Sequence, residues 1–180
     1  MEIKISTQTL LQIFKGLTWI VFIGLCIQAG TVLFNVLYAV SYQPNAAQYF
    51  FLDKLVEVAP SKFVVLMIHM LIVAVLKALL FYSVLKLFTE KRFDLEKPFT
   101  IHLQKLLSNM AYIALGISLF AAWGTRYLKQ LTAMKIELPN NETLFMGGAD
   151  VWLLLGIILL VLSLVVKRGI EMQQENELTI

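Results

Sequence analysis

Two ionisable side chains, His69 and Lys77, lie within a long apolar run of the sequence. Ionisable groups are costly inside a membrane, so such residues are candidates for a proton or ion pathway. On a helix the two positions are about 80° apart around the axis and ~12 Å apart along it, so the side chains cannot touch. We therefore expect His69 to be a neutral hydrogen-bonding group. We expect Lys77 to extend toward the headgroups beyond Leu87.

Two amides, Gln28 and Asn35, lie in another apolar run and share one helix face because they are seven residues apart. We interpret them as interhelical hydrogen-bonding groups, each worth about 1 kcal/mol or less. The alternative hypothesis is a small transporter or channel subunit that uses Gln28, Asn35, His69 and Lys77. A pathway would normally include an acidic partner, and no apolar run contains Asp or Glu.

The sequence lacks the residue patterns of common catalytic and metal sites. It has two histidines, His69 and His102, on different expected elements, and one cysteine, Cys26. We find no catalytic Ser-His-Asp or Cys-His set, no phosphate-binding glycine loop and no metal-ligand cluster. A single cysteine excludes an internal disulfide, and we expect it to be a small buried apolar group. We expect a protein that is not an enzyme, with no cofactor, metal site or catalytic residue.

The elements that carry these residues follow from composition. The chain has 180 residues, 59% hydrophobic and 15% charged, with a mean hydropathy of +0.77, whereas soluble domains are about 45–50% apolar and ~25% charged. Apolar runs long enough to approach or exceed the ~30 Å of a bilayer core cover residues 17–40, 63–87, 106–123 and 151–166. The sequence predicts one all-α domain over 1–180, an integral membrane four-helix bundle.

Positive charges predict the orientation, because Lys and Arg are enriched in cytoplasmic loops. Nine of the fifteen Lys and Arg residues lie before the first run, at the end of the second, between the second and third, or after the fourth. These nine are Lys4, Lys15, Lys86, Lys91, Arg92, Lys97, Lys105, Lys167 and Arg168. Five lie in the other two connections: Lys54, Lys62, Arg126, Lys129 and Lys135. We expect both termini, the loop 88–105 and the tail 167–180 to be cytoplasmic.

The segment 41–62 mixes apolar and charged residues between Pro44 and Pro60. Such a segment either rests on the membrane or caps the bundle. The connection after the third run is expected to begin as an extension of that helix, beyond Trp123.

Two motifs fall on the expected cytoplasmic side. Lys97-Pro98-Phe99-Thr100 marks a turn, with Thr100 as the N-cap of the third spanning helix and Phe99 placed to dock the turn against the bundle. The tail begins with Lys167-Arg168-Gly169 and ends with Glu175-Asn176-Glu177-Leu178-Thr179-Ile180.

Together these motifs resemble the bacterial membrane family called domain of unknown function 2975. The turn is similar to its "PFT" element, and the tail to its ending "RRG-x-x-L-x-x-ENDLTV". Here Met172, Glu177 and Ile180 replace the usual Leu, Asp and Val. The resemblance covers the layout of four spans with both motifs on one side.

Members of that family often occur beside a small helix-turn-helix regulator, which implies such a regulator as a cytoplasmic partner. We expect a regulatory or sensory protein of the bacterial cytoplasmic membrane that does not itself bind nucleic acid. Its oligomeric state stays open, a homo-oligomer included. The expected partner-binding residues are Pro98, Phe99, Thr100, Arg168, Gly169, Glu175, Asn176, Leu178 and Thr179.

Overall fold

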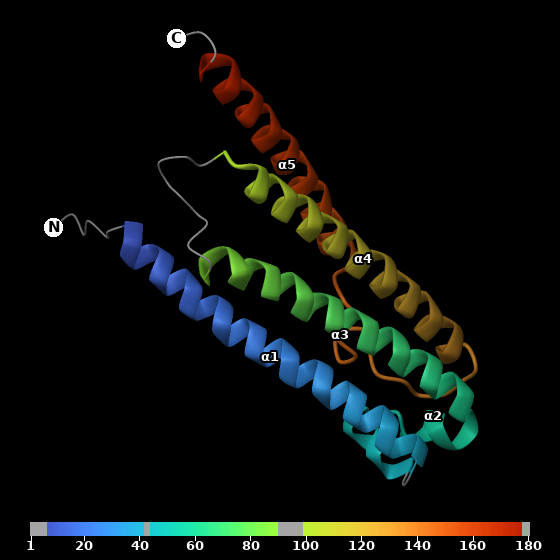
Figure 1. Cartoon of the computed structure of the whole chain (residues 1–180). Coiled ribbons are helices and arrows are strands. Elements are labelled where there is room, and N and C mark those ends of the chain that lie inside the picture. The colour runs from blue at the N-terminus through green and yellow to red at the C-terminus, as the bar shows by residue number, and fades with distance from the viewer. Residues whose placement is uncertain (1–6, 42–43, 90–98, 178–180) are drawn as a thin grey trace, which may run out of the picture.

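The computed structural model describes residues 7–41, 44–89 and 99–177, and this part of the chain is helical with short connections. Four long helices and two short ones follow one another along the chain (Figure 1). They are α1 (Thr7–Ser41), η1 (Pro44–Phe50), α2 (Asp53–Val58), α3 (Pro60–Thr89), α4 (Ile101–Thr132) and α5 (Ala149–Glu177). The predicted all-α four-helix bundle is confirmed.

The long helices run in alternating directions, and consecutive ones pack side by side: α1 on α3, α3 on α4, and α4 on α5 (Figure 1). We call the end where α1 and α4 begin and α3 and α5 end the terminal end. The opposite end, which carries η1 and α2, is the capped end. Each expected apolar run lies inside one long helix.

All four long helices are long and apolar enough to cross a membrane. The surface of α1 is the most open, with Ile20 70% and Ile27 65% exposed, which suits contact with lipid tails. Cys26 is also exposed, so the prediction that it is buried is wrong. The reason is that α1 packs mainly against α3, which leaves most of its circumference uncovered.

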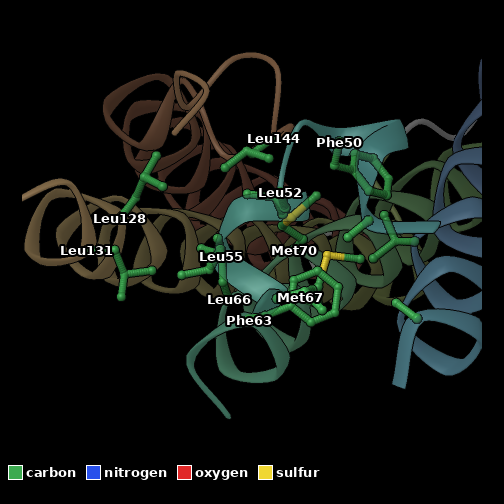
Figure 2. Packing of buried hydrophobic residues seen from close by; sticks show 14 of the residues in the cluster. Phe50, Leu52, Leu55, Phe63, Leu66, Met67, Met70, Leu128, Leu131 and Leu144 are labelled. Carbon is green, nitrogen blue, oxygen red and sulfur yellow. The ribbon is translucent and has the colours of Figure 1, made fainter. Parts of the chain in front are cut away.

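The segment 44–58 caps the bundle rather than lying apart from it (Figure 2). Leu52 and Leu55 are fully buried against Leu66 and Met70 of α3 and Leu128 of α4. Of the two alternatives left open by the sequence, the structure shows the cap.

Helices α4 and α5 approach closely because small residues line their contact. A Cβ on Gly156 would lie 2.7 Å from the side chain of Leu115. Ser118 donates a hydrogen bond of 2.7 Å to the carbonyl of Ala149, the first residue of α5. Since α4 continues to Thr132, about 14 residues or ~21 Å further, the connection 133–148 runs back along the bundle (Figure 1). The expected extension of this helix beyond Trp123 is confirmed.

Candidate functional site

The turn that leads into α4 has a well-defined N-cap. Thr100 is extended, with φ −124° and ψ 148°, and its hydroxyl accepts a hydrogen bond of 3.1 Å from the backbone N–H of Leu103. This contact satisfies one of the free N–H groups at a helix start. The predicted N-cap is confirmed, and it fixes the direction in which Phe99 leaves the helix.

Phe99 packs on Gly169 of α5, so the two sequence motifs meet at the terminal end. A Cβ on Gly169 would lie 2.7 Å from Cδ1 and 2.8 Å from Cγ of the Phe99 ring. Any larger residue would therefore push the ring away, and glycine lets the aromatic face reach the helix backbone. The predicted docking of this turn by Phe99 is confirmed, and the residue against which the Phe99 ring packs is Gly169.

Beside this contact an apolar groove of about 500 Å³ opens on the surface. Its lining residues come from both motifs and are Phe99, Val165, Arg168, Gly169, Met172 and Gln173. At its rim Arg168 donates a hydrogen bond of 2.9 Å to the carboxylate of Glu171. Both charged side chains are partly exposed, so the pair contributes little to stability but gives the groove a polar edge.

Of the other expected partner-binding residues, Glu175 is exposed on the last turns of α5. Pro98, Leu178 and Thr179 lie outside the described residues, as does the side chain of Asn176. The structure therefore brings Phe99, Arg168 and Gly169 together, with Thr100 holding the turn.

The ammonium of Lys77 does not extend toward the headgroups beyond Leu87, so that prediction is wrong. It donates a hydrogen bond of 2.8 Å to the carbonyl of Phe145 in the connection 133–148, and lies 5.6 Å from the ring centre of Trp152. Helical side chains lean toward the helix N-terminus, and α3 begins at the capped end. Lys77 therefore reaches toward the capped end.

His69 lies among aromatic rings of α4. Its Nδ1 is 2.8 Å from the carbonyl of Val65, which can only accept, so Nδ1 carries the proton. The ring stacks on Tyr127 at 5.8 Å and meets Trp123 edge-on at 5.4 Å. No contact between described residues joins His69 to Lys77, as the spacing predicted.

The amides of α1 differ from each other. Asn35 donates through Nδ2 to the carbonyl of Thr31 at 2.9 Å, so the bond that the structure shows for it lies within α1, whereas the sequence suggested a bond between helices. The nearest acceptor in an apolar setting is the carbonyl one turn back on the same helix. Within the described part of the chain, Nε2 of Gln28 is buried and has no hydrogen-bond partner.

Sequence reasoning missed Met146. This residue is fully buried in the connection 133–148, and its Sδ would lie 2.5 Å from a Cβ placed on Gly124 of α4. The same Cβ would lie 3.3 Å from Cβ of His69. Met146 therefore fixes the returning connection between α3 and α4. Gly124 was the available signal of close approach, since a glycine on a helix lets another segment come near its backbone.

The fold and these contacts define a membrane protein built from four apolar helices with a packed cap at one end. A family model described as "Protein of unknown function (DUF2975)" matches residues 9–180, and the chain belongs to that family. The family resemblance of the turn and the tail is thereby confirmed. No curated protein and no solved structure matches the chain.

Proposed function

We propose that this protein is a non-enzymatic regulatory or sensory protein of the bacterial cytoplasmic membrane, with its terminal end in the cytoplasm. The orientation rests on the charge distribution in the sequence, where nine of the fifteen Lys and Arg residues fall in or next to the N-terminal segment, the loop 88–105 and the tail 167–180. At that end the protein binds a soluble partner.

The observation that carries the proposal is the packing of Phe99 on Gly169 beside the open groove. Two motifs about 70 residues apart in sequence form one surface, with an apolar centre and the Arg168–Glu171 pair at its rim. Aromatic and apolar anchors with a polar rim are typical of protein-binding sites. The family resemblance favours a small helix-turn-helix regulator as the partner.

A transport role is the weaker alternative. It would use Gln28, Asn35, His69 and Lys77, but Asn35, His69 and Lys77 make contacts with three different parts of the structure. His69 packs on aromatic rings of α4, Asn35 bonds within α1, and Lys77 bonds to the connection 133–148. Uptake of ions by vesicles that contain the purified protein would favour the transport role.

Binding is tested by capture of the purified helix-turn-helix regulator on the immobilised protein. Phe99→Ala and removal of residues 171–180 should each abolish capture, because both take away walls of the groove. The matched control is Phe51→Ala, which removes an exposed phenylalanine at the capped end and should bind normally. Full capture by a truncated protein that melts normally in detergent would contradict the proposal. Loss of thermal stability on truncation would instead assign the tail to bundle packing.

Orientation is tested separately with cysteines at two exposed positions, Lys135 and Gln174, in a Cys26→Ala background. In intact cells an impermeant thiol reagent should label Lys135→Cys, whereas Gln174→Cys should react only after lysis. Labelling of Gln174→Cys in intact cells would contradict the proposed orientation and indicate the opposite one.

A further inference from the structure

An apolar groove of about 390 Å³ runs between α1 and α3 on the terminal half of the bundle. It is lined by Phe14, Leu17, Thr18, Val21, Phe81, Val84 and Phe88. Thr18 bonds back to the carbonyl of Phe14 at 2.8 Å, so its hydroxyl is already satisfied and the groove offers mainly hydrocarbon contact.

Helical register places two polar side chains beyond the end of this groove that faces the capped end, on the same faces of α1 and α3. Gln28 follows Val21 by seven residues, and Lys77 precedes Phe81 and Val84 by four and seven. Residues four and seven apart share a helix face. Gln28 and Lys77 therefore lie on the two helix faces that form the walls of the groove.

Among the described residues, both polar groups keep hydrogen-bond donors without an acceptor. The Lys77 ammonium contacts the Phe145 carbonyl and the Trp152 ring there, both of which are neutral, and an ammonium has three donors. Among the described residues Nε2 of Gln28 is buried without a partner. A cation within an apolar helix is stabilised by an anion that also accepts hydrogen bonds.

We propose that Lys77 and Gln28 bind the carboxylate of a single-chain amphiphile whose hydrocarbon tail lies in this groove. The two carboxylate oxygens match one ammonium donor and one amide donor. From Lys77 to Phe88 helix α3 rises ~16 Å, about half the ~30 Å thickness of a bilayer core, and the groove occupies the part of this length from Phe81 to Phe88. That depth suits a small headgroup on one chain, whereas the phosphate of a two-chain lipid belongs at the interface.

The proposal is independent of partner binding, because it concerns different residues in the middle of the bundle. The assay uses the fluorescence of Trp152, which lies beside the ammonium, in a Trp19→Phe, Trp123→Phe background. The probe is 2-bromododecanoate, whose bromine lies next to the carboxylate and quenches nearby tryptophan. Quenching should saturate, and unlabelled dodecanoate should reverse it.

Lys77→Met should weaken the probe's affinity about tenfold or more, since a charge-assisted hydrogen bond is lost, and Lys77→Arg should retain it. The matched control, Lys129→Met, removes an exposed lysine of α4 and should bind like the parent. Gln28→Leu leaves the contact between Lys77 and Phe145 in place and should also weaken binding of the probe. This second variant tests the proposal if the Lys77→Met protein does not fold.

Three results would overturn the proposal. The first is equal affinity in the parent, Lys77→Met and Gln28→Leu. The second is competition by dodecanol as effective as that by dodecanoate, because the alcohol carries no charge. The third is stronger competition by dodecyl phosphate, which would assign the site to phosphate headgroups.

Discussion

The most informative single change at the terminal end is Gly169→Ala. The added methyl group would lie 2.7 Å from the Phe99 ring, a distance that real side chains do not tolerate. The Phe99 ring must move away from α5, because the methyl group is fixed to the backbone of that helix. We expect the contact between the two motifs to be lost while the helices themselves remain folded.

The expected change in the free energy of unfolding is small. Alanine in place of glycine favours a helix by about 1 kcal/mol. Phe99 is 38% exposed, so releasing it forfeits about 1–2 kcal/mol of the ~1.5–3 kcal/mol for full burial of such a side chain. The net destabilisation should be about 0–1 kcal/mol, whereas partner capture should be lost.

Two measurements check this expectation. Unfolding in detergent gives the free energy. The reactivity of a cysteine placed at Met172, which lines the groove, reports whether the ring has moved, and should rise in the Gly169→Ala protein made in a Cys26→Ala background. The matched control is Gly24→Ala, where an added Cβ meets nothing within 4 Å. Unchanged cysteine reactivity, or a loss of stability of several kcal/mol, would refute the reasoning.

Three other changes test the elements around the sites. Thr100→Ala removes the N-cap of α4 and should cost about 1 kcal/mol in unfolding experiments, whereas Thr100→Ser should restore it. Met146→Ala leaves a cavity between α3 and α4 and should cost about 2–5 kcal/mol, which would appear as faster proteolysis in the connection 133–148. The Lys54 ammonium, by its hydrogen bond and charge, lowers the pKa of the Glu137 carboxyl. Stability from this pair is therefore present above the carboxyl's unfolded pKa and is lost as the pH falls through the folded one, so Glu137→Gln should reduce the acid dependence of the melting temperature. Because both side chains are exposed, the effect should be small, and a large one would contradict this assignment.

Several features of the fold could be predicted because local chemistry determines them. Four apolar runs can be hidden only by four membrane-length helices. The hydroxyl of Thr100 caps α4 because a helix start leaves N–H groups unpaired whatever packs around it. Two spanning helices, α4 and α5, separate the turn around Phe99 from the tail that begins near Gly169. The chain therefore crosses the bundle twice between the two motifs and returns to the same end.

Contacts between distant segments required the tertiary structure. From the sequence we expected the Lys77 side chain to extend toward the lipid headgroups. In the structure its ammonium donates a hydrogen bond to the carbonyl of Phe145, which the connection 133–148 brings beside α3. The sequence suggested burial for Cys26, but α1 packs mainly on one neighbour and leaves it exposed.

The sequence alone determined the number of helices, the cap at Thr100 and the common end of the two motifs. Only the tertiary structure decided that Phe99 packs on Gly169, that Met146 fills the space beside Gly124, and that Lys77 faces Trp152. The physical reason is that hydrophobic length and capping act over a few neighbouring residues, whereas close packing depends on the relative positions of helices, and these are fixed by every contact along them at once.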